Sequence, residues 1–285
     1  DNQIINYQID SYRKIRNTLR FLLGNLNNFD KQNLIIPDEM PELERYLLTR
    51  ISNLNEKLKE LVSRHDYHTI YTALLNFCTL ELSAFYFDIR KDSLYCDDIK
   101  SIKRRSTSTC LHIIFEFLTK WLSPIVSFTC EEAWKSRSYS NEESILLQNV
   151  KDDEFTYKDI SLEKVFEELK RVRKSVTSAL ELKRNEKLIG SSLQAKVILF
   201  LSKDTQKIIA DLDLAEMCIV SNVETHDISN RSAESISIED EEIYVEIKLA
   251  DGKKCDRCWT VLQEVSSNKN NLCNRCEDVW KSFQQ

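Results

Sequence analysis

The sequence ends in two Cys-x-x-Cys pairs, and this spacing constrains the fold more than any other feature. The first pair is Cys255 and Cys258, the second is Cys273 and Cys276, and fourteen residues separate the inner two. Two residues between paired cysteines let both sulfurs turn toward one point, and Zn²⁺ binds four thiolates tetrahedrally at about 2.3 Å. A loop of this length can bring the second pair back to the first. The sequence therefore predicts one closed, structural zinc site, with no position left for water or substrate.

Two other uses of paired cysteines fit less well. A disulfide framework suits small secreted chains, whereas this one has 285 residues, an odd nine cysteines and no recognisable signal peptide. A thioredoxin-like redox pair follows a strand at the start of a helix, and a single pair would suffice. The doubled spacing therefore favours zinc. The other five cysteines stand in apolar stretches and are interpreted as small core residues: Cys78, Cys96, Cys110, Cys130 and Cys218.

The composition favours a mainly α-helical protein. Only three glycines and three prolines occur in 285 residues, and these are the residues that interrupt helices. There is no run of about 20 apolar residues, so we expect no membrane span, and the unpaired cysteines indicate the cytoplasm. The net charge of −6 excludes a globally basic nucleic-acid binder but not a local basic surface. Residue 1 is Asp rather than Met, and we expect the chain to be part of a longer one.

Apolar residues at spacings of three and four predict a bundle of long helices. The predicted helices are 1–26, 41–64, 67–90, 99–135 and 162–187. In the first helix the apolar face is Tyr12, Ile15, Leu19, Leu22 and Leu26. The third is apolar on more than one side, which predicts a central position. Pro124 is expected to kink or divide the fourth, and Gly190 to end the fifth.

After Gly190 the pattern changes from helical to alternating. The segments 195–201, 216–224 and 241–249 are predicted strands, 203–212 is a predicted short helix, and 228–242 is a predicted loop. These elements indicate a small α/β module. We therefore expect three domains: a helical bundle at 1–150, a charged helix with the α/β module at 151–250, and a zinc-binding tail at 251–285.

The sequence offers no catalytic site. It contains no glycine-rich phosphate loop, no His-Glu-x-x-His pair and no Gly-x-Ser-x-Gly turn, and its four histidines are dispersed. We expect this chain to catalyse nothing by itself.

Two basic surfaces could bind nucleic acid. One is a stripe beside the apolar face of the first helix, formed by Arg13, Arg16 and Arg20. Guanidinium groups bind phosphate oxygens through paired hydrogen bonds. From the residues alone, a solvated helix face is the better explanation of this stripe. In the tail, basic residues surround Trp259, which could stack an unpaired base or instead cover the metal site. Those tail residues are Lys253, Lys254, Arg257, Lys269 and Arg275.

Five stretches in order resemble the C-terminal half of bacterial-type isoleucyl-tRNA synthetases. They are "YRKIRNTLRFLLGNLNNFD" (12–30), "LSAFYFDIRKDSLYC" (82–96), "RRSTSTCLHIIFEFLTKWLSPIVSFTCEEAW" (104–134), "RNEKLIGSSLQAKV" (184–197) and "CDRCW…LCNRC" (255–276). Together they span nearly the whole chain. The zinc tail separates it from valyl relatives, which share the helical domain but end in a coiled coil. Ser127 and Cys130 depart from the proline and alanine common at those two positions in the family.

The resemblance implies a fold and a role. The fold would be the anticodon-binding helical bundle of a class I synthetase, then a small α/β junction, then a Cys₄ zinc knuckle. This part would dock the anticodon stem-loop of isoleucine tRNA as a monomer. ATP and isoleucine would react in the N-terminal catalytic domain, which, like the editing domain, is missing here. The resemblance also places Arg13, Arg16 and Arg20 near the tRNA backbone, and Trp259 with Arg257 near the anticodon.

Two other classes of function remain open from the residues alone. A DNA-repair glycosylase can pair a helical domain with a terminal Cys₄ finger, but we find neither its N-terminal catalytic proline nor its DNA-binding helices. A non-catalytic zinc-ribbon adaptor that binds protein partners is the third possibility.

Overall fold

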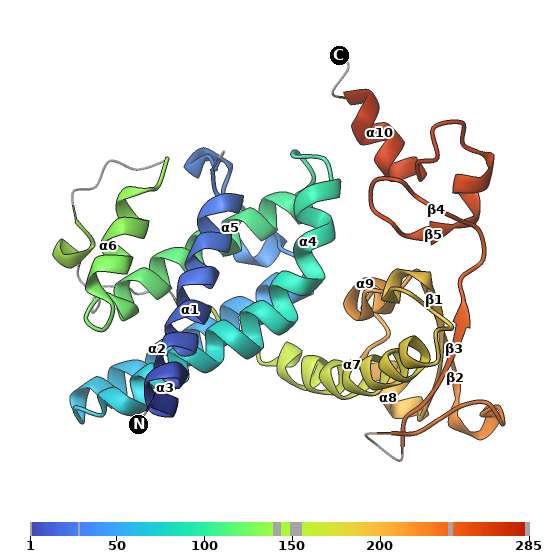
Figure 1. The fold of residues 1–285 in the computed structure, drawn as a ribbon, viewed down its shortest axis with the longest axis horizontal. Coiled ribbons are helices and arrows are strands. Elements are labelled where there is room, and N and C mark those ends of the chain that lie inside the picture. Colours follow the sequence, from blue (N-terminus) through green and yellow to red (C-terminus); the bar gives the residue numbers. More distant parts are fainter. Residues whose placement is uncertain (1, 28, 139–143, 149–155, 239–241, 283–285) are drawn as a thin grey trace. The chain divides into compact units, whose positions relative to one another are not determined.

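The protein is described here by a computed structural model that covers residues 2–27, 29–138, 144–148, 156–238 and 242–282 (Figure 1). The chain forms two compact units, Asp1–Asp159 and Ile160–Gln285. The second unit holds both the α/β module and the zinc tail. The division into three functional domains therefore stays a prediction.

Unit 1 is a bundle of helices, as the apolar spacing predicts. Its α-helices are α1 (Asn2–Asn25), α2 (Glu42–Ser63), α3 (Tyr67–Asn76), α4 (Phe87–Cys96), α5 (Ile102–Leu122) and α6 (Ser127–Lys135). A π-helix, η3 (Phe77–Tyr86), joins α3 to α4, and the 3-10 turns are η1 (Lys31–Asn33), η2 (Pro37–Glu39) and η4 (Ile145–Leu147). The predicted division at Pro124 is confirmed, because α5 ends before it and α6 begins after it.

Short polar side chains set where several of these helices begin. The Asp66 carboxylate accepts the N–H of Thr69, and the Ser101 hydroxyl accepts the N–H of Arg104. Each satisfies a backbone donor that has no partner within the first turn of a helix. The predicted helix at 99–135 therefore starts three residues later than its apolar pattern suggested.

The predicted apolar face of α1 is confirmed for four of its five residues. Ile15, Leu19, Leu22 and Leu26 are 0–2% exposed. Tyr12 is 36% exposed, and its hydroxyl lies 2.9 Å from the Thr129 hydroxyl of α6. An amphipathic Tyr at the edge of a packed face keeps its polar tip near water in this way.

The third predicted helix runs through the centre of unit 1. It continues from Tyr67 to Cys96, six residues beyond the predicted end, through the π-helical segment. Within the described residues, this helix is the one long and apolar enough to cross a membrane by length and composition. Half of its apolar window is buried inside the protein, as in a core helix of a globular bundle.

A buried ion pair crosses the centre of the bundle. The Arg90 guanidinium of α4 donates to both carboxylate oxygens of Glu44 on α2, at 2.7 Å each, and both side chains are at most 1% exposed. The hydroxyls of Tyr86 and Thr107 also donate to Glu44 Oε1, at 2.9 and 3.2 Å. Burial raises the pKa of Tyr86 well above its ordinary value, so its hydroxyl keeps the proton it donates. Nothing in the sequence pattern indicated this network.

Unit 2 opens with one long helix on a three-stranded sheet. The elements are α7 (Ser161–Asn185), η5 (Ser192–Gln194), β1 (Ala195–Leu201), α8 (Lys203–Ile208), α9 (Leu214–Cys218), β2 (Asn222–Asp227), η6 (Ile228–Asn230) and β3 (Tyr244–Leu249). The strand order is β2-β1-β3. β1 pairs in parallel with β2, where Lys196 faces Asn222, and antiparallel with β3, where Ala195 faces Leu249. The central strand is almost wholly buried, as its unbroken apolar run predicts.

Two details of the α/β module correct the sequence-based prediction. Gly190 does not end α7, because the helix stops at Asn185 and Lys187 supplies the left-handed residue, with φ 61°. The predicted strand at 216–224 is wrong over its first six residues, 216–221. The Asp213 carboxylate accepts the N–H of Glu216 and starts α9, so the strand begins only at Asn222.

The zinc tail follows β3 through a tight turn. It contains β4 (Lys253–Lys254), β5 (Val261–Leu262), η7 (Gln263–Ser267) and α10 (Asn274–Ser282). Gly252 has φ 119°, and a Cβ there would lie 2.3 Å from the carbonyl carbon of Leu262, so only glycine fits. The Ser221 hydroxyl accepts the N–H of Val261 at 2.8 Å and donates to the Leu193 carbonyl. This hydroxyl fastens the tail to the α/β module.

Candidate zinc centre and basic surfaces

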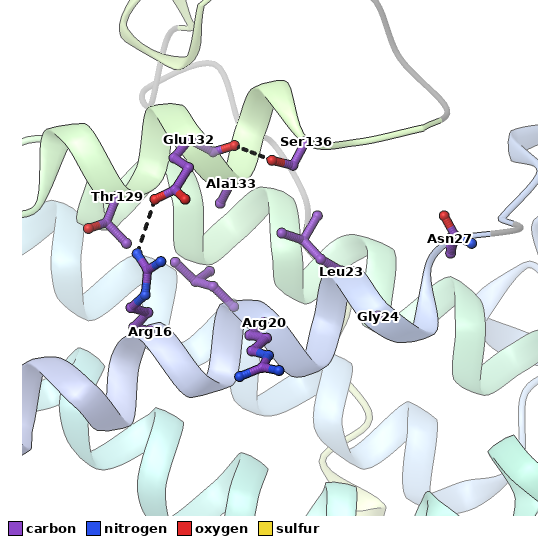
Figure 2. A pocket seen from close by; sticks show the side chains of 10 residues that line it. Arg16, Arg20, Leu23, Gly24, Asn27, Thr129, Glu132, Ala133 and Ser136 are labelled. Atoms are coloured by element: carbon purple, nitrogen blue, oxygen red, sulfur yellow. Dashed lines mark hydrogen bonds and ion pairs between the residues drawn. The ribbon is translucent and has the colours of Figure 1, made fainter.

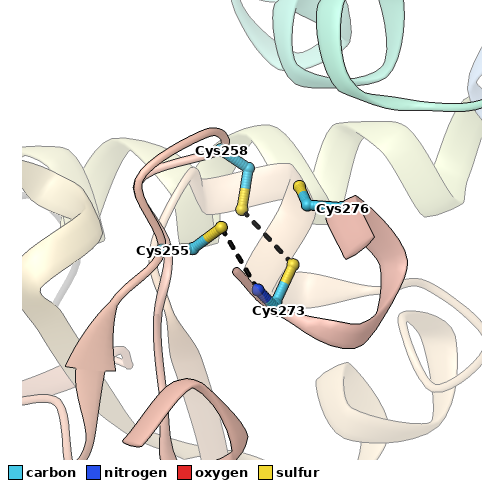
Figure 3. Close-up of side chains that lie close together, drawn as sticks. All are labelled: Cys255, Cys258, Cys273 and Cys276. Atoms are coloured by element: carbon cyan, nitrogen blue, oxygen red, sulfur yellow. Dashed lines mark hydrogen bonds between the residues drawn. The ribbon is translucent and has the colours of Figure 1, made fainter. Parts of the chain in front are cut away.

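The four predicted cysteines converge on one point. Their sulfurs all lie within 4.8 Å of one another, and all four side chains are buried (Figure 3). The structure thus brings together two pairs that lie fourteen residues apart in the sequence.

Each pair is positioned by a different local structure. Cys255 and Cys258 lie in the loop between β4 and β5, closed by hydrogen bonds from the Cys255 N–H to the Thr260 carbonyl and from the Trp259 N–H to the Cys255 carbonyl. Cys273 immediately precedes α10 and Cys276 lies in its first turn. The N-terminus of a helix favours negative charge and therefore thiolates. The Cys273 N–H also donates to the Cys255 sulfur at 3.3 Å.

The geometry fits a tetrahedral zinc ion. The sulfurs of Cys258 and Cys273 are 3.8 Å apart. Zinc–sulfur bonds of about 2.3 Å give a tetrahedron whose edges are roughly 3.8 Å. Hydrogen bonding to Cys276 and burial raise the pKa of Cys258 to about 12, and burial raises the pKa of Cys273 to about 11. A divalent cation supplies the positive charge that such crowded thiolates require. Four sulfur donors leave no open position, so the ion is structural.

Trp259 is the most exposed apolar group of the first knuckle. Its backbone is left-handed, with φ 68°, a conformation that a bulky residue adopts only under constraint. The side chain is 59% exposed, and the Lys254 ammonium lies 5.0 Å from the ring centroid. A Trp that covered the metal would be buried, whereas this ring is open to solvent.

The other predicted basic residues of the tail differ in their surroundings. Lys253 donates to the Asn271 side-chain oxygen at 2.6 Å. Arg257 is half-buried, whereas Arg275 is exposed on α10. The tail therefore exposes positive charge at Lys253, Lys254 and Arg275, and of these Lys254 lies beside the Trp259 ring.

The predicted arginine stripe of α1 is exposed, but its members are not equivalent. Arg13 pairs with Asp10 at 3.3 Å, and Arg16 pairs with Glu132 of α6 at 3.0 Å. Glu132 raises the pKa of Arg16 above its ordinary value. Arg20 has no hydrogen bond or ion pair within the part of the chain that the structure describes. Arg20 is thus the freest cation of the three.

A groove of about 510 Å³ lies between α1 and α6. Arg16, Arg20, Asn27, Thr129 and Glu132 line it, together with apolar side chains (Figure 2). Figure 2 shows that Arg16 reaches Glu132, whereas Arg20 lies one turn further along α1 and does not point toward it. The pairing of Arg16 with Glu132 could not be predicted from the sequence, because only the packing of α6 against α1 brings the two together.

A second groove in unit 1 also escaped the sequence analysis. Its volume is about 740 Å³, and its lining combines the exposed ring of Tyr95 with Lys100, Arg104 and Arg105. The Arg104 guanidinium donates to the Asp97 carbonyl at 2.7 Å, which fixes it at the start of α5. The run of basic residues at 103–105 was the available signal, but the groove exists only where α1, α4 and α5 meet.

Comparison with known proteins identifies the bundle. Residues 44–199 match the model of the anticodon-binding domain of tRNA ligases. The chain belongs to this family. A second family, described as the zinc finger found in FPG and IleRS, matches residues 252–279 and includes all four cysteines. The zinc-finger match and the buried cysteine cluster support one structural zinc ion in this member of the anticodon-binding family.

Relatives of this anticodon-binding chain carry the name isoleucine–tRNA ligase. The protein from Pelagibacter ubique is 42% identical over 92% of the chain, and that from Gluconobacter oxydans is 38% identical over 97%. The protein from Desulforamulus reducens is 35% identical over 98%. The chain spans only 28–31% of the length of these three relatives, within their C-terminal part.

The two family matches include the predicted RNA-binding residues of the tail but not those of α1. The anticodon-binding match begins at residue 44, so Arg13, Arg16 and Arg20 lie before it. Trp259 and its basic neighbours lie inside the zinc-finger match.

Proposed function

We propose that this chain docks the anticodon stem-loop of isoleucine tRNA as the C-terminal part of an isoleucine–tRNA ligase. One observation carries the proposal: similarity to isoleucine–tRNA ligases continues through both the bundle and the zinc tail, over 92–98% of the chain. In this proposal the ATP-dependent activation of isoleucine and any editing occur in other domains of the ligase, and the ligase works as a cytoplasmic monomer.

The proposal assigns a role to each part of the chain. Residues 1–150 form the anticodon-binding bundle, 151–250 the junction, and 251–285 the zinc tail. Cys255, Cys258, Cys273 and Cys276 hold the zinc. The ion contributes no chemistry to the ligation; it fixes the short β4–β5 hairpin against α10, which have few apolar contacts of their own.

In the bundle, the groove between α1 and α6 is the proposed contact with the tRNA backbone. Arg20 is placed to receive a phosphate without first breaking an ion pair, and Arg16 can exchange Glu132 for a phosphate. Arg13, paired with Asp10 on the same exposed surface, is expected to contribute least.

In the tail, Trp259 is proposed to stack an unpaired base. Its exposed ring and the neighbouring Lys254 supply the aromatic face and the cation that bind single-stranded RNA. Lys253, Arg257 and Arg275 would then hold adjacent phosphates.

A titration of the zinc-loaded chain tests the proposal. Isoleucine tRNA, valine tRNA and duplex DNA are each added at several salt concentrations. We expect the chain to prefer isoleucine tRNA. Equal weak binding to all three would contradict the proposal, and preference for DNA would favour the glycosylase-like alternative that shares this zinc finger.

A pair of variants locates the contact in the bundle. Arg20→Gln should weaken tRNA binding about threefold to tenfold and reduce the salt dependence by about one phosphate contact. Lys57→Gln removes an exposed cation from α2 instead, and its affinity should equal that of the unmodified chain. Equal affinities for both variants would remove Arg20 from the proposed interface.

A further inference from the structure

The zinc tail is joined to the α/β module at two points within unit 2. Near the start of the tail, the Ala250 N–H donates to the Gln194 carbonyl at 2.8 Å. Further along, the Val261 N–H of β5 donates to the Ser221 hydroxyl at 2.8 Å, and that hydroxyl donates in turn to the Leu193 carbonyl. A single point of contact would let the tail pivot, whereas two points set its direction.

Ser221 is itself held by the sheet of the α/β module. The residue is 8% exposed, and its N–H donates to the Ala195 carbonyl at the start of β1, at 3.1 Å. Its hydroxyl acts as a donor and as an acceptor at the same time. A buried hydroxyl that makes both bonds is fixed in one direction, so the Val261 N–H is held in one place.

Strained backbone lies before both partners of this hydrogen bond. Ile219, two residues before Ser221, is left-handed with φ 57°, and Trp259, two residues before Val261, has φ 68°. Left-handed backbone is unfavourable for β-branched and bulky residues and persists where the surrounding structure imposes it, often at functional sites. The turn at Ile219 ends α9 and brings Ser221 to β1, and the turn at Trp259 closes the first knuckle.

The first knuckle links the position of Val261 to that of Trp259. The Cys255 N–H donates to the Thr260 carbonyl at 2.9 Å, and the Thr260 hydroxyl lies 3.5 Å from the Cys258 sulfur. Val261 therefore directly follows a loop that is closed by hydrogen bonds and by two zinc ligands. Because this loop is closed on itself, a shift of Val261 would move the exposed Trp259 ring with it.

We propose that Ser221 is a positioning residue for RNA binding: its hydroxyl sets the direction in which the zinc tail presents the Trp259 ring. The inference rests on the proposed function, in which that ring stacks an unpaired base. A ring held in one orientation binds a base without first losing the freedom to turn. Ser221 does not touch the RNA and acts through Val261.

A distance measurement without RNA tests the positioning. Lys207→Cys on α8 and Lys281→Cys on α10 add two exposed thiols, whereas all nine native cysteines are buried. Nitroxide labels on the two new thiols give the distribution of distances between module and tail by pulsed electron paramagnetic resonance. In the zinc-loaded chain this distribution should be narrow. Adding Ser221→Ala should make it about twice as wide, because a segment that loses one of its few contacts moves more freely.

The matched control is Ser229→Ala. The Ser229 hydroxyl donates to the Asp227 carboxylate at 2.6 Å within the module, so its loss should leave the distribution narrow. Equal widths with and without Ser221→Ala would overturn the inference. Loss of zinc in Ser221→Ala would also overturn it, because the hydroxyl would then stabilise the metal site rather than orient the tail.

A double-mutant cycle on tRNA affinity tests whether Ser221 acts through Trp259. Trp259→Ala should weaken binding of isoleucine tRNA roughly tenfold and Ser221→Ala about threefold, since stacking on an aromatic ring contributes on this order. In the Trp259→Ala chain, Ser221→Ala should have no further effect. Unchanged affinity in Ser221→Ala, or the same loss in both backgrounds, would overturn the inference. A chain that does not prefer isoleucine tRNA would defeat the proposed function, while the label distances would still report on Ser221.

Discussion

The helical bundle and the zinc tail reach a fixed structure by different means. The bundle buries long apolar stripes, such as Ile15, Leu19 and Leu22 of α1, around one central helix. The tail has two two-residue strands and one nine-residue helix, and its buried centre consists of four cysteines with Val265 and Val279. Short elements with so little apolar area need a metal or a disulfide to stay folded.

Because of this difference, the zinc site is easier to predict from the sequence than the contacts within the bundle. A metal site depends on a few residues at fixed spacing, so it can be predicted from the spacing alone. A bundle depends on many interchangeable contacts, and one of its central interactions, between Glu44 and Arg90, joins residues 46 positions apart. The two regions should therefore respond very differently to single substitutions.

Loss of the zinc should give the largest effect, and it should be confined to the tail. In Cys276→Ser the ion loses one of four ligands, and structural zinc contributes on the order of 10 kcal/mol to the folding of small domains. Amide exchange of residues 253–282 should become fast, while the thermal transition of unit 1 stays in place. Loss of the bundle in the same variant would show that the two regions do not fold independently.

Breaking the buried ion pair of the bundle should destabilise unit 1 and leave the zinc tail folded. Glu44→Ala removes the buried carboxylate that balances the Arg90 charge in the core, which costs about 3–5 kcal/mol. Denaturant unfolding should show this loss in unit 1 with unchanged zinc content. The double variant Glu44→Leu with Arg90→Met should recover much of the stability, because it removes both charges together. If Glu44→Ala alone is as stable as the wild type, the pair is not a structural element of the core.

Acid should weaken the bundle through His112. Burial, followed by Lys31, Arg137 and Lys120, lowers the pKa of His112 from 6.5 to about 4. Its ring nitrogen lies 3.6 Å from Glu116, but burial and the three cations outweigh that carboxylate. The unfolded chain binds the proton first, so about 3 kcal/mol of stability, present above pH 6.5, is lost as the pH falls toward 4.

The matched variant for this effect is His112→Phe, which keeps the ring stacked on Phe29. Over the same pH range it should lose less stability than the wild type, as measured by denaturant unfolding at each pH. Parallel pH profiles for the two proteins would exclude His112 as the cause.

The smallest effect concerns the charge of the proposed RNA surface on the bundle. Glu132→Gln frees Arg16 from its exposed ion pair and should tighten binding of isoleucine tRNA roughly twofold to fivefold. Glu60→Gln makes the same charge change beside Arg64 on α2, away from the groove, and should have no effect. If both variants bind tRNA equally, the groove between α1 and α6 does not contact the RNA backbone, and the tail alone provides the basic surface.

Much of the architecture follows from local patterns. The stripe through Ile15, Leu19 and Leu22, the division at Pro124 and the buried run of β1 were each predictable, because helix and strand periods are properties of neighbouring residues. Errors occurred where short-range hydrogen bonds compete with periodicity. The Asp213 carboxylate starts α9 inside a segment that looks like a strand, and Lys187 rather than Gly190 takes the left-handed position after α7.

The sequence by itself determined the zinc ligands, the mainly helical fold and the resemblance to isoleucyl-tRNA synthetases, because each depends on residue types at short or fixed separations. Only the tertiary structure decided which cations are free. Among the residues that the structure describes, Arg13 and Arg16 are paired and Arg20 is not, since the partner of Arg16 lies 116 residues away on α6. The structure alone also revealed the Glu44–Arg90 pair, which joins α2 to α4. Charge pairing and burial depend on which helices pack together, and no local spacing encodes that.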